Sequence, residues 1–344
     1  MLTDSFGRTL DYLRVSVTDR CNLRCAYCMP PEGVEYQPHE TILRFEEILR
    51  LCRILADLGI RRIKVTGGEP LVRKGVVSFI RAVKTIPGIE QVTLTTNGVL
   101  VDPYLDELAA APLAGINVSL DSLNPETFRR ITGTGSPFAA PGGGEQTGVA
   151  ASPAAIVETM KRAQSLGIPV KVNCVPLRNV NEGELAGLAA LAEQTVGAVR
   201  FIELMPLGRA GVMEPVLGSE VRAILKGCSL RLYRTAEQLG NGPAVYYEVP
   251  GFSGRIGFID AVSRGFCETC NRLRLTPEGL LKPCLSSALA LDVRAMLRSG
   301  ASDSRIAEAV IRVAARKPAR HDFSAVYGNQ REDHHDTAMF RIGG

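Results

Sequence analysis

Short β-branched segments alternate with amphipathic helical patterns over the first 225 residues, and this alternation limits the possible folds more than any other feature. Six segments look like strands bounded by turn residues: 12–18, 62–66, 91–96, 116–120, 170–175 and 199–204. Helical patterns, with apolar residues three or four apart, cover 45–58, 75–85, 103–110, 153–166 and 182–193. The alternation predicts parallel strands joined by right-handed helical crossovers.

Six β/α units are too few to close an eight-fold barrel, so the predicted fold is α/β, an incomplete (β/α)6 barrel of the TIM type with an open lateral cleft. After residue 225 the regular alternation ends. Strand patterns follow at 246–249, 256–259, 273–275 and 280–282, and helical patterns at 291–297 and 304–314. We therefore predict a partial barrel over 1–225 and a C-terminal region over 226–344 that covers the cleft. The stretch 133–152 has the composition of a flexible loop, and we assign it no role.

Composition narrows the class of protein. Apolar residues make up 45% of the chain and charged residues 22%, which excludes global disorder. A net charge of +4 is too small to indicate a nucleic-acid binder. The longest apolar stretches, 108–116 and 185–191, fall short of the ~20 residues of a membrane helix, and the start lacks a secretory signal pattern. We expect a cytoplasmic protein that binds neither membrane nor nucleic acid.

Nine cysteines in such a chain argue against a disulfide framework. Three of them, Cys52, Cys174 and Cys228, are scattered in apolar surroundings and are expected to be small core residues. The other six form two tight triads: Cys21, Cys25 and Cys28, and Cys267, Cys270 and Cys284.

The first triad follows directly after the first predicted strand, at the barrel edge where ligands bind. A [4Fe–4S] cube normally takes four thiolates, so three leave one iron open to a small molecule. A zinc site with a distant fourth ligand and three unrelated cysteines are the alternatives. The spacing of Cys21, Cys25 and Cys28, with Tyr27 before the last cysteine, favours the cluster.

This motif resembles that of the radical S-adenosylmethionine (SAM) superfamily. The resemblance implies that the open iron binds SAM, and that an electron from the cluster cleaves SAM to a 5′-deoxyadenosyl radical, which removes a hydrogen atom from the substrate. The run Thr-Gly-Gly-Glu-Pro at 66–70 follows the second predicted strand. The resemblance assigns Gly68 to the SAM amino group, and Tyr27, Ser119 and Met205 to further SAM contacts.

The second triad has thirteen residues between Cys270 and Cys284. A structural zinc site would need a fourth ligand, and none of the four histidines stands at finger-like spacing. Beside the first triad, a second three-cysteine cluster is favoured. Arg272 and Arg274 alternate on a predicted strand, so both point to one face, where they suit phosphates. A solvated basic face is the alternative.

Together with the terminal Gly343-Gly344, these motifs resemble the GTP 3′,8-cyclase family, or molybdenum cofactor biosynthesis protein A family, over residues 2–344. The resemblance implies a carbon–carbon lyase with two [4Fe–4S] clusters and SAM. Its radical would abstract the C3′ hydrogen of GTP, and the product would be (8S)-3′,8-cyclo-7,8-dihydroguanosine 5′-triphosphate, in the first step of molybdenum cofactor biosynthesis. The second cluster would hold the purine.

The same resemblance assigns the GTP contacts: Arg14, Lys64, Thr95, Lys171, Arg200, Arg272 and Arg274. It assigns catalysis to Arg272, Arg274 and a tail, Gly343 and Gly344, that enters the active site. The residues themselves agree, because cations on apolar strands are costly unless they meet a counter-ion, and a triphosphate carries about four negative charges. Lys64 departs from the family pattern, in which arginine is commoner.

The resemblance also implies partners: reduced flavodoxin or ferredoxin as electron donor, cyclic pyranopterin monophosphate synthase as product acceptor, and a homodimer. One rival interpretation is another radical SAM enzyme whose auxiliary cluster serves a peptide or RNA substrate. A peptide modifier would not need phosphate-binding cations, and an RNA modifier should show a broad basic surface. A second rival is a non-enzymatic electron-transfer protein, for which a scaffold of six β/α units is needlessly large.

Overall fold

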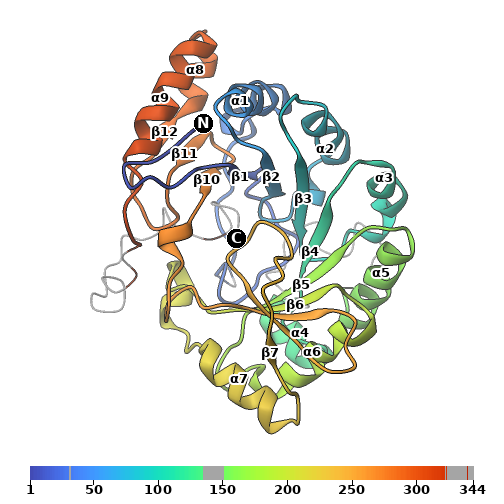
Figure 1. The fold of residues 1–344 in the computed structure, drawn as a ribbon. Helices are drawn as coiled ribbons and strands as arrows, with labels where there is room; N and C mark the ends of the chain where they lie inside the picture. Colours follow the sequence, from blue (N-terminus) through green and yellow to red (C-terminus); the bar gives the residue numbers. More distant parts are fainter. Residues whose placement is uncertain (31, 135–150, 322, 324–338, 340–344) are drawn as a thin grey trace.

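Six parallel strands follow one another in space in the order of the sequence, as the β/α rhythm predicts. The computed structural model describes residues 1–30, 32–134, 151–321, 323 and 339. The strands are β1 (Tyr12–Ser16), β2 (Arg62–Thr66), β3 (Gln91–Thr96), β4 (Gly115–Ser119), β5 (Val170–Cys174) and β6 (Ala198–Ile202). They curve into a partial barrel, with helices around its outside (Figure 1).

The C-terminal region extends this sheet at both edges. Strand β9 (Arg255–Ile259) pairs in parallel with β6, and β10 (Arg272–Leu275) pairs in parallel with β1. Beyond β9 lie the antiparallel β8 (Val245–Glu248) and β7 (Tyr233–Arg234). Beyond β10 lie the antiparallel β11 (Leu280–Lys282) and β12 (Leu291–Asp292). The twelve strands form one open sheet that begins with β12 and ends with β7. The sequence analysis expected the C-terminal region to cover the cleft and did not predict that its strands pair with the barrel strands.

The helices cover the outer face of the sheet and have recognisable end signals. In chain order they are α1 (Phe45–Asp57), α2 (Val76–Lys84), α3 (Leu105–Ala110), α4 (Pro125–Thr132), α5 (Pro153–Ser165), α6 (Leu185–Gln194), α7 (Gly218–Gly227), α8 (Val293–Arg298) and α9 (Asp303–Ala315). Ser152 caps α5 and Ser302 caps α9, each side chain accepting a backbone N–H of the first turn. Helix α4 begins at Pro125, is capped by Asn124 and ends at Gly133, whose φ of 68° suits glycine.

Alternation along the strands separates core from cavity. On β1, Leu13 and Val15 are fully buried in the main hydrophobic core. Arg14, between them, has the opposite orientation and lines the cavity inside the barrel. Fully burying one such apolar side chain contributes about 1.5–3 kcal/mol to folding, which fixes the register of the strand.

The α/β fold with a parallel sheet is confirmed, and each predicted strand is present within two residues at either end. The sequence analysis missed α4 and α7, although Asn124 before Pro125 is a helix-start signal. Cys52 and Cys174 are buried as predicted, but the prediction for Cys228 is wrong: it is exposed just after α7, because it follows the last helical turn. Residues 135–150 of the predicted loop lie outside the described residues. Among the described helices, none combines the length and apolarity needed to cross a membrane.

Candidate active site

All six cysteines of the two triads line one cavity inside the barrel. The first triad lies in the loop after β1, and the second lies in the C-terminal region, with Cys267 in a short 3-10 turn (Cys267–Thr269) just before β10. Because β10 pairs with β1, the two loops lie at neighbouring places on the same sheet. Segments more than 230 residues apart in sequence thus face a common space.

The first triad is held by its own backbone. The N–H groups of Cys28 and Met29 both donate to the Cys25 carbonyl, at 2.8 and 2.9 Å. Burial, with the nearby Glu69 carboxylate, raises the pKa of Cys21 to about 12. Burial and the charges of its two partner cysteines raise the pKa of Cys25 well above its usual range. The thiols of Cys21 and Cys25 therefore keep their protons until a bound metal displaces those protons.

Gly67 and Gly68, after β2, lie against the backbone that leads into the first triad. Gly68 N–H donates to the Thr18 carbonyl at 2.7 Å. A Cβ at Gly68 would lie 2.4 Å from the Arg20 carbonyl oxygen, too close for any side chain. Glycine is therefore required here by the approach of the cysteine loop, in addition to the SAM contact that the sequence analysis assigns to it.

Glu69, the next residue, is fully buried and was missed as a site residue. Its carboxylate accepts the backbone N–H of Leu71 and of Asn97 and the hydroxyl of Thr96, at 2.7–3.0 Å. Burial raises the pKa of Glu69 to about 7 against these three hydrogen bonds. The carboxylate thus joins the ends of β2 and β3 beside the cysteine loop. The sequence signal available for Glu69 was its place next to Gly68 in the Gly-Gly-Glu-Pro run.

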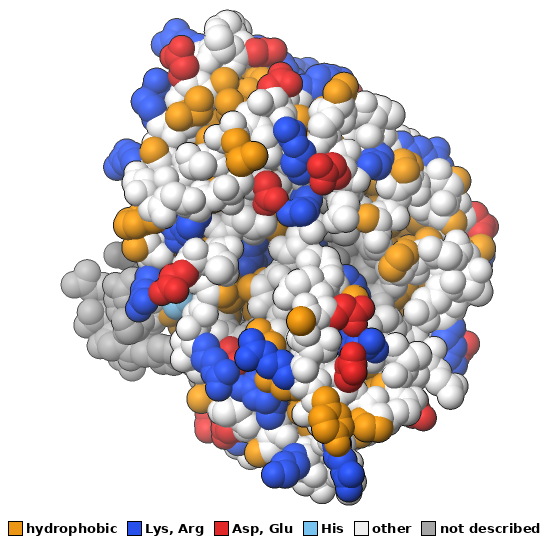
Figure 2. Space-filling view, viewed as in Figure 1, with side chains coloured by type: hydrophobic (Ala, Val, Ile, Leu, Met, Phe, Trp, Pro, Cys, Tyr) orange, Lys and Arg blue, Asp and Glu red, His pale blue; other side chains and the backbone are white. Residues whose placement is uncertain are grey.

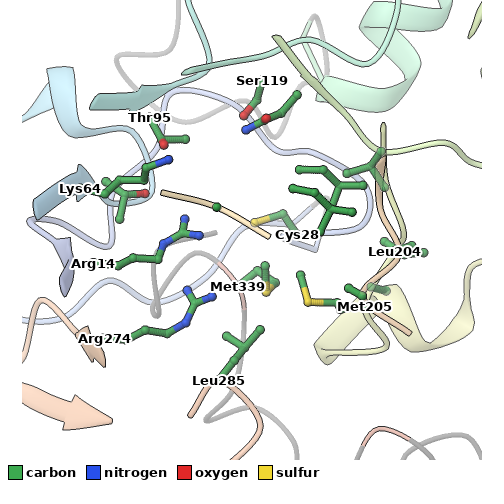
Figure 3. A pocket seen from close by; sticks show the side chains of 18 of the residues that line it. Arg14, Cys28, Lys64, Thr95, Ser119, Leu204, Met205, Arg274, Leu285 and Met339 are labelled. Atoms are coloured by element: carbon green, nitrogen blue, oxygen red, sulfur yellow. The ribbon is translucent and has the colours of Figure 1, made fainter. Parts of the chain in front are cut away.

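The four predicted SAM contacts, Tyr27, Gly68, Ser119 and Met205, all line the cavity. Tyr27 donates its hydroxyl to Asp121 at 2.6 Å, and burial raises the pKa of that carboxyl to about 6. Figure 3 shows Ser119 and Met205 on opposite sides of Cys28. Met205 packs with a small apolar cluster that includes Leu285 and Met339. The predicted contacts therefore surround the first triad.

Cations from neighbouring strands form the opposite wall. Arg14 is the register partner of both Lys64 on β2 and Arg274 on β10. Figure 3 shows these three side chains reaching into the cavity from one side. Arg200 and Arg272 also line it. On the outer face in Figure 2, by contrast, acidic and basic side chains are mixed over most of the surface.

The concentration of buried positive charge in this wall favours the binding of an anion. Burial, followed by the charges of Arg272 and Arg200, lowers the pKa of Arg14 to about 10. The pKa of Lys64 is held well below its usual range by burial first and then by the surrounding cations. No carboxylate in the described residues pairs with Lys64 or Arg200 within salt-bridge distance. A bound polyanion would remove the mutual repulsion.

Thr95 Oγ1 and Asn173 Oδ1 are among the polar atoms of the cavity wall that are buried without a hydrogen-bond partner in the described part of the chain. Thr95 is a predicted GTP contact. Asn173 was not predicted, although it lies two residues beyond Lys171 on the same face of β5 and is the register partner of Ser119 and Arg200. Buried polar atoms are nearly always satisfied, so both positions fit contacts to a ligand.

Lys171 differs from the other predicted GTP contacts. Its ammonium donates to the Leu239 carbonyl at 2.6 Å, and it is absent from the described lining of the cavity. Its charge still reaches Lys64, whose pKa it helps to lower. Lys171 therefore lies outside the described lining of the cavity. Gly343 and Gly344 lie outside the described residues.

The second triad has its own set of contacts. His321 N–H lies 3.4 Å from Cys267 Sγ, and Cys284 Sγ lies 3.5 Å from the Ser286 hydroxyl. Lys317, which the sequence analysis missed, donates to the carbonyls of Arg272 at 2.8 Å and Pro283 at 2.5 Å, close in sequence to Cys270 and Cys284. Within the described ranges, no three cysteine, histidine or acidic side chains are placed to share a single metal ion. Each triad offers three thiol donors to the cavity, which is the donor chemistry of a cube with one iron left open.

Comparison with known proteins gives matches along nearly the whole chain. The Radical SAM superfamily model matches residues 15–192, and the Molybdenum Cofactor Synthesis C model matches residues 197–323. The GTP 3′,8-cyclase of Heliobacterium modesticaldum is 46% identical, with 93% of this chain and 94% of the relative covered. The GTP 3′,8-cyclase of Desulforamulus reducens is 41% identical, with both chains covered in full.

Among solved structures, SuiB of Streptococcus suis bound to S-adenosylmethionine is similar in fold. The TM-score is 0.57 at 14% sequence identity, and the match covers 83% of this chain and 64% of SuiB. At this identity the likeness concerns the fold alone.

Proposed function

The chain belongs to the GTP 3′,8-cyclase family of the radical SAM superfamily, and on that premise we propose how its residues carry out the first step of molybdenum cofactor biosynthesis. GTP is the substrate, and the product is (8S)-3′,8-cyclo-7,8-dihydroguanosine 5′-triphosphate. The observation that carries the proposal is one cavity lined by both cysteine triads and by a row of cations from β2, β1 and β10.

The first triad supplies three thiolates for a [4Fe–4S] cluster and leaves one iron for SAM. Cys21, Cys25 and Cys28 have the donor chemistry for this cluster and lie in one short loop. With an electron from the bound cluster, SAM provides the 5′-deoxyadenosyl radical that takes the hydrogen atom from C3′ of GTP. Gly68 and Ser119 position SAM, and Tyr27 and Met205 close the space around it and exclude water.

The cation wall binds the triphosphate of GTP and orients its ribose. Arg14, Lys64 and Arg274 form one row across β2, β1 and β10, which suits a chain of phosphates. Arg200 and Arg272 line the same cavity and add to its positive charge. Thr95 offers its buried hydroxyl to a ligand, and the charge of Lys171 acts on Lys64. The substrate anion thereby offsets the mutual repulsion of the buried cations.

Cys267, Cys270 and Cys284 would hold another [4Fe–4S] cluster, whose open iron would bind the guanine base. The second triad lines the same cavity as Arg272 and Arg274, so one region of the cavity can bind both the base and the phosphates of GTP. Arg272 lies over the Phe266 ring, with 4.6 Å between its guanidinium carbon and the ring centre, which fixes its direction. We assign catalysis to Arg272, Arg274 and the tail residues Gly343 and Gly344, which complete the pocket.

The partners follow from the reaction. An electron must come from a small reduced carrier, flavodoxin or ferredoxin, and the product passes to cyclic pyranopterin monophosphate synthase. The protein acts in the cytoplasm as a homodimer.

The proposal is tested by anaerobic reconstitution and iron counting. We expect about eight irons per chain, in two cubes of four. Formation of 5′-deoxyadenosine should then be much faster with GTP than with ATP or without nucleotide. The variants Cys21→Ser, Cys25→Ser and Cys28→Ser should abolish SAM cleavage. Replacement of Cys267, Cys270 or Cys284 by serine should first impair GTP binding.

Two outcomes would contradict the proposal. Unchanged turnover of GTP in the Cys267→Ser, Cys270→Ser and Cys284→Ser variants would remove the second triad from the substrate site. Cleavage of SAM that does not respond to GTP, but does respond to a peptide or RNA, would favour the rival radical SAM interpretation.

A further inference from the structure

Lys317 is a buried lysine beside the second triad, just beyond the end of α9, and its side chain is only 3% exposed. Its ammonium donates to the Arg272 carbonyl at 2.8 Å and to the Pro283 carbonyl at 2.5 Å. Two of the three N–H donors of the ammonium are thus used on backbone carbonyls.

These two acceptors belong to the two segments that carry the second triad. Cys270 and Arg272 lie where β10 begins, and Pro283 immediately precedes Cys284. Lys317 therefore joins both segments through one charged group. Hydrogen bonds from a charged donor contribute about 1.5–3 kcal/mol each, enough to fix the relative position of two loops.

The two triads also differ in the charges around them. Near the first triad lies the buried Glu69 carboxyl, which accepts the Asn97 N–H at 2.7 Å, and the Asn97 side-chain amide in turn reaches Cys21 Sγ. Near the second triad lies the buried Lys317 ammonium, which is bonded to the carbonyl of Pro283, the residue before Cys284. Cations and hydrogen bonds to sulfur stabilise the reduced form of an iron–sulfur cluster.

We propose that Lys317 is a positioning residue of the second triad, which holds the Cys270 and Cys284 segments in register and makes a cluster there easier to reduce. The inference rests on the proposed function, since it requires a cluster at Cys267, Cys270 and Cys284. Lys317 acts through its buried charge and through the backbone carbonyls of the two segments.

Arg8 provides a matched control, because it holds the same C-terminal segment by other bonds. Its guanidinium donates to the carbonyls of Cys267 and Pro318 at 2.7 Å and of Ala319 at 3.0 Å. It is itself fixed by Asp4. Within the described residues, the Arg8 guanidinium bonds to neither the Arg272 nor the Pro283 carbonyl. Arg8→Met should therefore loosen the segment while Lys317 keeps its bonds to Arg272 and Pro283.

The test uses the full chain with Cys21→Ser, Cys25→Ser and Cys28→Ser, so that only the second triad can bind a cluster. After anaerobic reconstitution, iron is counted and the cluster is titrated by electron paramagnetic resonance at controlled potentials. In this background we expect about four irons per chain. Lys317→Met should lower the ratio of reduced to oxidised cluster at a fixed potential about tenfold, a shift of ~59 mV to more negative values. Lys317→Arg, which keeps a cation with N–H donors, should restore most of the shift, and Arg8→Met should leave the potential nearly unchanged.

The outcomes separate this inference from the proposed function. If the triple-serine background binds no iron, the proposed second cluster is wrong. If it binds iron and Lys317→Met has the same midpoint potential, the inference is wrong. If Lys317→Met loses its iron while Arg8→Met and Lys317→Arg retain theirs, the positioning role is supported. Equal loss in Lys317→Met and Arg8→Met would reduce Lys317 to a general anchor of the segment and overturn the inference.

Discussion

Arg14 and Lys64 are register partners on adjacent parallel strands, and both place their cations in the cavity between the cysteine triads. Like charges in this position repel, and burial adds to the cost, so the pKa values of both side chains are lowered. The arrangement persists in the fold because the apolar neighbours of Arg14, Leu13 and Val15, fix the register of β1 from the other face.

Lys64→Met should weaken GTP binding about 10- to 100-fold, because one charge-assisted contact of about 1.5–3 kcal/mol is lost. Binding is measured by equilibrium dialysis of radiolabelled GTP with the anaerobically reconstituted protein. Lys161→Met, which removes an exposed lysine on α5, is the control and should bind GTP normally. Equal GTP affinity in the Lys64 and Lys161 variants would remove Lys64 from the substrate site.

Lys171 should make the stability of the metal-free protein depend on pH. Burial, and then Arg200, lower its pKa in the folded state to about 8, against 10.5 for the ordinary side chain. Below pH 8 Lys171 is protonated in both the folded and the unfolded state, so the free energy of unfolding is lowered by the full cost of burying its charge. Between pH 8 and 10.5 the folded state releases the proton first, so the free energy of unfolding should rise with pH.

This contribution is isolated by comparing the wild-type protein with Lys171→Met in urea unfolding at several pH values. Other groups titrate in both proteins and cancel in the difference. The wild type should gain stability relative to the variant as the pH rises through this window. A difference that is constant with pH would show that Lys171 keeps an ordinary pKa in the fold.

Gly68→Ala should disturb the first triad. The new Cβ would lie 2.4 Å from the Arg20 carbonyl oxygen, so the backbone before Cys21 must move. We expect a loss of about 1–3 kcal/mol in the free energy of unfolding, as for overpacking elsewhere, together with less iron at the first triad. Gly183→Ala is the control, since a Cβ at Gly183 meets no atom within 4 Å. Normal iron content and stability in Gly68→Ala would contradict the close approach.

Deletion of Gly343 and Gly344 should abolish cyclisation of GTP while both clusters and SAM binding persist. The reason is the proposed role of the tail in completing the pocket. Product formation, iron content and SAM affinity are measured on the same preparation. Loss of iron on deletion would instead assign the tail a role in folding.

Local patterns predicted most of the fold and much of the site. The spacing of apolar residues located α1, and the β-branched runs located β2 and β3 at their observed bounds. The cysteine triads and the pair Arg272 and Arg274 were visible because their members are close in sequence. Such features need no knowledge of the tertiary structure.

What the sequence did not reveal depends on contacts between distant segments. The pairing of β10 with β1 joins residues about 260 positions apart, and no local pattern encodes it. Lys317 looks like an ordinary lysine after a helix until Arg272 and Pro283 are seen around it. Lys171 was grouped with the other cations, and only the fold shows that the Leu239 carbonyl takes its ammonium.

The pairing of β9 with β6 and of β10 with β1 has a consequence for how this chain can be divided. A fragment that stopped at residue 225 would leave the backbone N–H and carbonyl groups of β1 and β6 bare on both margins of the barrel. Unpaired margins of this kind recruit strands from other molecules and lead to aggregation. The N-terminal two thirds and the C-terminal third are therefore expected to fold as one unit.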